Sequence, residues 1–258
     1  TDHGKGDVFS GHRPHRLHPM IRLSNPEETS TQLALAGKER AIDLLRHYLK
    51  FRKISGGVMC LMGFTGSGSH VTGARRRART VIRRHKGVSV GRPIGEAWKK
   101  NRFRAPYLRN TLWSLGYAAD TVETAVSWDR VTTTMTALEK AIRESLSPMN
   151  ENVHVFSHLS HVYATGSSIY TTFLFRLAGT PEETLARWQA IKTAASRAIV
   201  AAGGTISHQH GVGTDHREFL EAEKGVVGMD ILRELMANVD PDGRFNPGKL
   251  VGGAPDGS

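Results

Sequence analysis

Two histidines in the C-terminal part of the chain have a spacing that suits proton transfer. His208 and His210 flank Gln209 in the run TISHQHGVGTDH at residues 205–216. In an extended backbone, alternate side chains point to opposite faces, so the two imidazoles would share one face and Gln209 the other. Neighbouring imidazoles can share a proton or donate hydrogen bonds to a developing anion. The competing interpretation is a polar strand end with two solvated histidines.

A tyrosine in a β-branched run is a second candidate for proton transfer. Tyr170 lies in SSIYTTFLFRL at residues 167–177, a composition that predicts a strand. Alternation places Tyr170 on the more polar face, away from a face that carries Ile169, Thr171, Phe173 and Phe175. A phenol can give or take a proton there if a neighbouring cation or histidine favours the phenolate. An ordinary half-exposed strand tyrosine is the alternative.

Arginines are the third group with chemical potential. Residues 51–110 hold 15 lysines and arginines against one acid, Glu96, so this stretch carries +14 and the rest of the chain −3. Arg109, in RAPYLRN at 104–110, could clamp a phosphate or carboxylate with its planar guanidinium. The densest basic cluster comprises Arg75, Arg76, Arg77, Arg79, Arg83 and Arg84. Such a cluster favours a solvated surface or an anionic partner. Because no aromatic residues are interleaved with the arginines, nucleic acid is disfavoured as that partner.

The elements that must position these residues predict an α+β fold, with an antiparallel or mixed sheet covered by helices and a helical C-terminal tail. Cap signals at Asn25-Pro26 and at Thr180-Pro181-Glu182-Glu183 open two of the helices. The expected helices cover residues 26–52, 67–86, 132–147, 181–202 and 215–237. The expected strands cover residues 20–24, 57–64, 88–90, 152–159 and 167–177.

Composition fits a soluble globular protein, with 39% hydrophobic and 23% charged residues among 258. Cys60 is the single cysteine, which excludes an internal disulfide and favours a reducing compartment. No apolar run approaches the roughly 20 residues that a membrane-spanning helix needs. His12, His15 and His18 have a spacing that could suit zinc, but Pro14 and Pro19 disfavour a helix there, so no metal site is predicted.

Several motifs, taken in order, resemble the C-terminal half of the alkyldihydroxyacetonephosphate synthases, members of the vanillyl-alcohol-oxidase type of FAD-linked oxidases. The similarity covers about residues 20–250, and the order and spacing of its motifs make it specific. The motifs are IRLSNPEET (21–29), YLRNTLWSLGYAADTVETAVSWDRV (107–131), ATGSSIYTTFLF (164–175), GGTISHQHGVGTDHR (203–217) and DPDGRFNPGKL (240–250).

The resemblance implies a role for individual residues. Tyr170 would transfer a proton, and His208 and His210 would belong to the catalytic histidine cluster, with Tyr163 as a further candidate. Arg109 and Arg22 would bind the substrate anion. The positions implied for contact with the FAD cofactor are Gln209, Gly211 and Asn246. Gln209 stands where the family has the middle histidine of three, and glutamine cannot carry a titrating proton.

The resemblance also implies a domain organisation. Residues 1–19 would be a loop or disordered lead-in, 20–202 the substrate-cap domain, 203–250 the histidine segment with a helical tail, and 251–258 a disordered tail. The glycine-rich loop that cradles the FAD pyrophosphate in the family has no counterpart here, since GFTGSGSH (63–70) lacks the P-loop Gly-Lys-Ser/Thr ending. The chain would therefore need a FAD-binding domain of the same polypeptide as its partner.

The implied reaction exchanges the acyl chain of acyl-dihydroxyacetone phosphate for a fatty alcohol, in ether lipid biosynthesis. Two alternatives are an FAD-linked oxidase or dehydrogenase of a small hydroxy acid, and a binding module for anionic lipid or nucleic acid. With a phosphorylated lipid precursor as substrate, the expected location is the cytoplasm, including a membrane surface, or the peroxisome in a eukaryote. A homodimer is compatible with the family.

Overall fold

The computed structural model describes residues 20–35, 39–54 and 56–251, which form two compact units. The described part of the smaller unit comprises Met20–Arg22 and Cys60–Phe103, and the larger unit begins at Leu23–Met59 and resumes at Arg104. The expected lead-in at 1–19 and all but the first residue of the expected tail at 251–258 lie outside the described residues. The domain boundaries inferred from the resemblance stay predictions.

The five strands found among the described residues form one sheet in the order β2-β1-β4-β5-β3, and the α+β prediction is confirmed. The pairs β1/β4, β4/β5 and β3/β5 are all antiparallel. The strands are β1 (Met20–Ser24), β2 (Met59–Gly63), β3 (Tyr117–Ser127), β4 (His154–Val162) and β5 (Gly166–Arg176).

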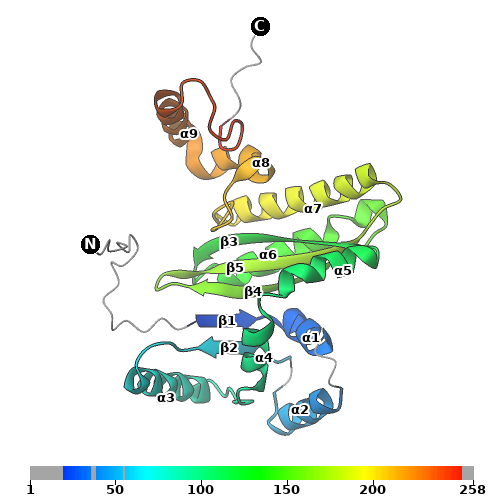
Figure 1. The fold of residues 1–258 in the computed structure, drawn as a ribbon, viewed down its shortest axis with the longest axis vertical. Coiled ribbons are helices and arrows are strands. Elements are labelled where there is room, and N and C mark those ends of the chain that lie inside the picture. The colour runs from blue at the N-terminus through cyan, green and yellow to red at the C-terminus, as the bar shows by residue number, and fades with distance from the viewer. Residues whose placement is uncertain (1–19, 36–38, 55, 252–258) are drawn as a thin grey trace, which may run out of the picture. The chain divides into compact units, whose positions relative to one another are not determined.

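Two helices cover one face of the larger unit's sheet and bury most of its core (Figure 1). On β5 the side chains alternate as expected, with Ile169, Thr171 and Phe173 fully buried and Tyr170 half-buried. α6 (Val131–Glu144) and α7 (Pro181–Ala201) contribute Leu138, Ile142, Ile191, Ala195 and Ile199 to this core. Apolar burial fixes the register of β5, because a one-residue slip would send Phe173 to the other face.

The remaining helices are mostly short. They are α1 (Pro26–Leu35), α2 (Glu39–Phe51), α3 (Gly68–Arg84), α4 (Pro93–Asn101), α5 (Leu108–Ser114), α8 (Gly213–His216) and α9 (Leu220–Val239), with single 3₁₀ turns at Ala105–Tyr107, Ser147–Met149 and Arg217–Phe219. Both predicted caps form: the Glu28 backbone N–H donates to Asn25 Oδ1 at 2.8 Å, and Thr180 with Glu183 makes a capping box.

Three elements differ from the prediction. The run at 88–90 forms no strand, because it follows α3 in an irregular segment without a pairing partner. The helix expected over 26–52 is observed as α1 and α2, and residues 36–38 lie outside the described part of the chain. The helix expected over 215–237 is broken at Gly225, whose φ of 70° is left-handed.

β3, which pairs with β5 along its whole length, was not predicted as a strand. Its hydrophobic alternation is interrupted by two acids on opposite faces of the strand: Glu123 is buried, and the half-buried Asp120 accepts a hydrogen bond from the Trp188 indole at 2.7 Å. A buried acid counts against a core strand in any hydropathy pattern.

Gly166, at the start of β5, is a position where stability can be tested. A Cβ there would overlap the backbone carbonyl of Val126 on β3, and a backbone atom in a sheet cannot move aside cheaply. We expect Gly166→Ala to destabilise the larger unit by about 2 kcal/mol or more, the range of overpacking and strain.

Urea unfolding followed by circular dichroism would measure that loss. Gly179→Ala is the matched control, since a Cβ there meets only the Glu183 Oε2 atom at 3.5 Å, an ordinary contact. Equal midpoints for the two variants would show that β3 and β5 separate enough to admit a methyl group.

Candidate active site

A row of polar side chains crosses the three paired strands of the larger unit. Tyr170 on β5 lies directly opposite Glu123 on β3 and His158 on β4, so the three share one face of the sheet. The His158 ring stacks on the Tyr170 ring with centroids 5.0 Å apart. From α1, Glu28 places Oε1 3.1 Å from His158 Nδ1. Along this row an acid, a phenol and an imidazole on the sheet are followed by a second acid that α1 contributes.

Glu123 is the centre of this site. Its side chain is only 2% exposed, and its carboxylate contacts three histidines. Oε1 lies 3.2 Å from Nδ1 of both His161 and His208, while Oε2 lies 3.2 Å from His210 Nε2. A carboxylate has about four acceptor positions, so it can accept an N–H from each ring. The structure therefore brings the predicted His208 and His210 together through an acid that the motif analysis did not single out.

The histidine segment is held against β3 by backbone bonds. The Thr205 and His208 N–H groups donate to the carbonyls of Ala125 and Glu123, at 3.4 and 3.0 Å. Ser207 Oγ closes the following turn by donating to the Gly211 carbonyl at 2.7 Å. Gln209 has a φ of 62°, so the segment is not extended there. The predicted arrangement, with both histidines on one side, is observed, but a left-handed residue rather than strand alternation produces it.

Tyr170 lies between two imidazole rings. Besides the stacked His158, His210 meets it edge-on with centroids 5.5 Å apart. Its hydroxyl donates to Thr121 Oγ1 at 3.4 Å, a long hydrogen bond. Both imidazoles contact the Tyr170 ring, and its role as a proton carrier stays a prediction.

Tyr163 is the phenol that contacts a predicted catalytic histidine directly. Its hydroxyl lies 3.0 Å from His208 Nε2, and its ring meets the His208 ring edge-on. The side chain is exposed at the turn that joins β4 to β5. Sequence reasoning gave Tyr163 a lesser place than Tyr170, and the structure gives it the shorter contact.

The same cluster is where the described residues could hold a metal ion. The ligand atoms of Glu123, His161 and His208 all lie within 4.8 Å of one another. Two imidazoles and a carboxylate are a donor set that zinc accepts. The contacts are also those of a carboxylate that accepts N–H bonds, and the sequence motifs predict no metal. The spaced histidines at positions 12, 15 and 18 lie outside the described residues.

Three residues expected to contact the flavin are open to an approaching ligand. Gln209 and Asn246 are exposed and have positive φ values, 62° and 47°. At Gly211 an added Cβ would meet nothing within 4 Å, so the backbone there is uncovered. Neutral amide side chains can hydrogen-bond to the edge of a flavin ring, and the contact of these residues with the cofactor stays a prediction. They offer no charge for its phosphates.

The two arginines expected to bind the substrate anion are not part of the histidine cluster. Arg109 lies on α5 in the larger unit, is exposed, and makes no ion pair with any residue that the structure describes. Its fork is therefore available to an anion. Arg22 lies half-buried in β1 and belongs to the smaller unit. Both binding roles stay predictions.

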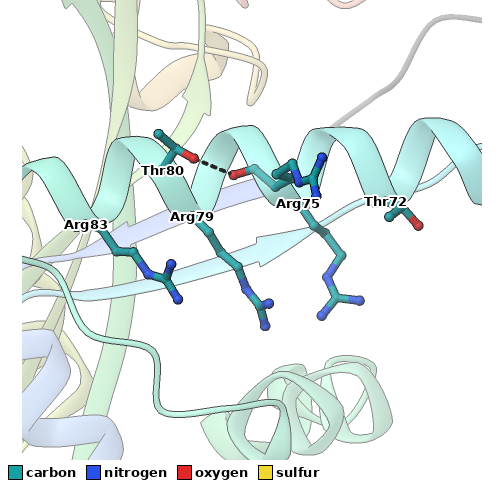
Figure 2. A pocket seen from close by; sticks show the side chains of 6 residues that line it. Thr72, Arg75, Arg79, Thr80 and Arg83 are labelled. Atoms are coloured by element: carbon teal, nitrogen blue, oxygen red, sulfur yellow. Dashed lines mark hydrogen bonds between the residues drawn. The ribbon is translucent and has the colours of Figure 1, made fainter.

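The clustered arginines form α3 of the smaller unit, a helix of 17 residues that contains no acid. Arg75, Arg79 and Arg83 recur every fourth residue and point to the same side (Figure 2). With Thr72, Arg76 and Thr80 they line a shallow hollow of about 360 Å³. A hollow built on one helix is an open surface, which suits solvated side chains and would also admit an anionic partner.

His216, on α8, is a histidine of another kind. It is buried, and burial together with the nearby Lys192 lowers its pKa. Its Nδ1 lies 3.4 Å from Ser196 Oγ on α7. A neutral imidazole packed under the helices is a core residue, so the last histidine of the HQHGVGTDH run is separate from the cluster around Glu123.

Sequence reasoning missed Glu123, His158 and His161. The signal for Glu123 is its place at the start of the ETAVSWDRV motif, but the motif alone does not assign a role to this acid. His158 and His161, two of the three histidines on β4, belong to FSHLSHVY, where a spacing of three means that they cannot share one face of a regular strand. The ladder shifts between Leu159 and Val162, and this irregularity brings His161 round to Glu123.

Comparison with known proteins places this site in a family. The family described as FAD linked oxidases, C-terminal domain, matches residues 14–250. Alkyldihydroxyacetonephosphate synthase of Dictyostelium discoideum is 24% identical over 240 residues, which are 90% of this chain and 39% of that protein. The protein of the same name from Trypanosoma brucei brucei is 25% identical over 197 residues, 76% of this chain and 32% of that protein.

A solved structure of an alkyldihydroxyacetonephosphate synthase has the same fold, with a TM-score of 0.58 at 20% identity over 86% of this chain and 38% of the other. The chain thus spans about two fifths or less of the proteins it matches. FAD is the cofactor that goes with this domain, and the resemblance found in the motifs is confirmed. With a match that covers most of its length, the chain belongs to the C-terminal domain family of the FAD linked oxidases.

Proposed function

We propose that this chain is the substrate-cap and C-terminal part of a FAD-dependent enzyme that exchanges the acyl chain of acyl-dihydroxyacetone phosphate for a fatty alcohol. The observation that carries the proposal is the group of His208 and His210 around Glu123, beside Tyr170, in a chain similar to alkyldihydroxyacetonephosphate synthases over most of its length. Such an exchange needs groups that accept and return protons close together.

A flavin-binding domain of the same polypeptide would supply the other wall of the site. When bound, FAD would supply an electrophilic ring, and the exchange would proceed with no net oxidation. This chain would bind the neutral edge of the ring through Gln209, Gly211 and Asn246. Tyr170, His208 and His210 would move protons on the substrate. Arg109 would bind its phosphate, and Arg22, which belongs to the smaller unit, is a separate candidate for binding the substrate anion.

The test uses the complete flavoprotein, meaning the polypeptide in which this chain is joined to a flavin-binding domain. Acyl-dihydroxyacetone phosphate and a labelled fatty alcohol are supplied together, and the labelled ether product and released fatty acid are measured. Anaerobic mixing with small hydroxy acids is the parallel arm. Flavin bleaching by a hydroxy acid, without ether product, would replace the proposal by the alternative of an FAD-linked dehydrogenase.

Arg109 provides a sharper test of the substrate class. We expect Arg109→Lys to raise the substrate KM of the complete flavoprotein more than Arg79→Lys does, because a point charge does not replace a fork that binds a phosphate through two bonds. Arg79 is the matched control: it has the same side chain and lies on the arginine face of α3. Small, equal changes in KM would remove Arg109 from the substrate site.

The arginine face of α3 supports one non-enzymatic alternative, the binding of anionic lipid. Binding of the chain to vesicles with and without anionic lipid, at rising salt, would measure it. Salt-sensitive binding that Arg75→Gln and Arg79→Gln abolish, together with a complete flavoprotein that lacks exchange activity, would favour that alternative.

A further inference from the structure

Tyr163, His208 and Glu123 form a linear chain of hydrogen-bonding atoms. The Tyr163 hydroxyl lies 3.0 Å from His208 Nε2, and His208 Nδ1 lies 3.2 Å from Glu123 Oε1. Both distances lie within the range that a nucleophile or acid shares with its base. The exposed fraction falls along the chain, from 43% for Tyr163 to 15% for the His208 side chain and 2% for that of Glu123.

One arrangement of protons makes both contacts hydrogen bonds and activates the Tyr163 hydroxyl. In it the Glu123 carboxylate accepts the Nδ1–H of His208. The other nitrogen of the neutral ring, Nε2, is then bare and accepts the Tyr163 hydroxyl proton. The arrangement is that of a hydroxyl, a base and a carboxylate that orients the base, which is how hydroxyl groups are activated for proton transfer.

Backbone bonds hold all three members in place. The Tyr163 N–H donates to the Gly166 carbonyl at 2.8 Å, and the Tyr163 carbonyl accepts the Trp128 indole N–H at 3.2 Å. The His208 N–H donates to the carbonyl of Glu123 itself at 3.0 Å. A fixed backbone restricts the Tyr163 ring to its few rotamers, and the rotamer in the structure places the hydroxyl at His208 Nε2.

Tyr170 lacks this arrangement. Its hydroxyl has only the long contact to Thr121 among the described residues, and its two imidazole neighbours meet its ring rather than its oxygen. The groups that face His208 are Glu123 from β3, Tyr163 from the turn after β4, and the tilted ring of His161 from β4, whose centroid is 5.5 Å away. Of the two tyrosines, Tyr163 is thus the one whose hydroxyl contacts an imidazole nitrogen that can act as its base.

We propose that Tyr163 is a catalytic proton carrier, with His208 as its base and Glu123 as the positioning residue. The inference rests on the proposed function for its substrate, which is the hydroxyl of the incoming alcohol. As that O–H bond breaks, its proton moves to the Tyr163 oxygen and the Tyr163 proton moves to His208 Nε2. The substrate oxygen keeps the electron pair, and the imidazolium that forms is balanced by Glu123. Total charge is unchanged.

The first test needs no activity. Long-range ¹H–¹⁵N NMR of the ¹⁵N-labelled chain identifies the His208 tautomer, with His208→Gln assigning the signals. We expect a neutral ring with its proton on Nδ1, and a Tyr163→Phe variant whose Nε2 signal moves toward that of a bare nitrogen. A His208 ring protonated on Nε2 in the wild type would overturn the relay. So would a stoichiometric metal that Glu123→Gln removes, because Nδ1 would then be a ligand.

The second test uses the complete flavoprotein. Tyr163→Phe should lower kcat about 10²-fold, the usual loss for a general acid or base, with KM and thermal stability unchanged. Glu123→Gln should lower kcat and raise the fraction of the wrong His208 tautomer. Tyr117→Phe, a half-exposed tyrosine on β3, is the matched control and should behave as the wild type.

The two tests separate the possible failures. A wild-type flavoprotein without exchange activity would defeat the proposed function, and the NMR arm would still decide whether the hydrogen-bonded chain exists. Wild-type kcat in Tyr163→Phe, in an enzyme that does exchange acyl chains, would defeat the relay and leave the proposed function intact.

Discussion

Replacing Tyr170 by phenylalanine should lower the turnover of the complete flavoprotein about 10²-fold or more while leaving the fold intact. The ring packs between His158 and His210, and phenylalanine keeps both ring contacts. The hydroxyl has one long bond to Thr121, so its removal costs little folding energy. What is lost is the one atom that can carry a proton from this position on β5.

The measurement is a comparison of kcat and of the unfolding midpoint between wild type and Tyr170→Phe. Tyr117→Phe controls for removal of a hydroxyl elsewhere on the same sheet, at the far end of β3. Wild-type turnover in Tyr170→Phe would return Tyr170 to the role of a half-exposed strand residue. A lowered midpoint together with lowered turnover would instead show that the polar row holds the sheet together.

The parts of the fold that the sequence predicts are those in which local chemistry and tertiary packing agree. Thr180 caps α7 because its hydroxyl and the Glu183 side chain accept hydrogen bonds from backbone N–H groups at the start of the helix. These bonds are local, so they form whatever the helix packs against. β5 is predicted because it is rich in β-branched residues and because its side chains alternate between more and less buried positions. β3 is missed because the half-buried Asp120 and the buried Glu123 have partners, Trp188 and the histidines, that come from distant segments.

The site follows the same division. His208 and His210 could be selected from their spacing and glycines, and Tyr170 from its strand. Glu123 could not be selected from the sequence, because a single acid has no partners in its own segment. Its partners arrive only when the β3–β5 register sets it opposite Tyr170 and when residues 205–208 bind alongside β3. His161 and Tyr163 depend on a shifted ladder at the end of β4, and no pattern of residue types predicts a shift of that kind.

Among the described residues of the smaller unit, no cluster of acids, histidines and tyrosines resembles the one around Glu123. The basic character of this unit is evident from composition, and the alignment of Arg75, Arg79 and Arg83 along one side of α3 follows from their four-residue spacing once the helix forms.

Purified by itself, the 258-residue chain should be colourless and should not take up FAD in stoichiometric amounts. The two phosphates of FAD need backbone donors at a helix N-terminus or cations that face them together. Gln209, Gly211 and Asn246 are neutral and would reach only the ring. The relatives that the chain matches are two to three times longer, which leaves room for a phosphate-binding domain outside this match.

The experiment records absorbance in the flavin bands and titrates the chain with FAD by calorimetry, before and after addition of the separately expressed flavin-binding domain. We expect colour and exchange activity only with both parts present. Tight FAD binding by the chain alone would contradict this and would direct attention to residues 63–68, where β2 is followed by a glycine-rich turn and α3 begins at Gly68. Gly66 has a φ of 138°, a conformation that a side chain rarely adopts, so in that outcome Gly66→Ala should weaken FAD binding. Gly57→Ala would be its control, because a Cβ there makes only an ordinary contact with Ile54 at 3.7 Å.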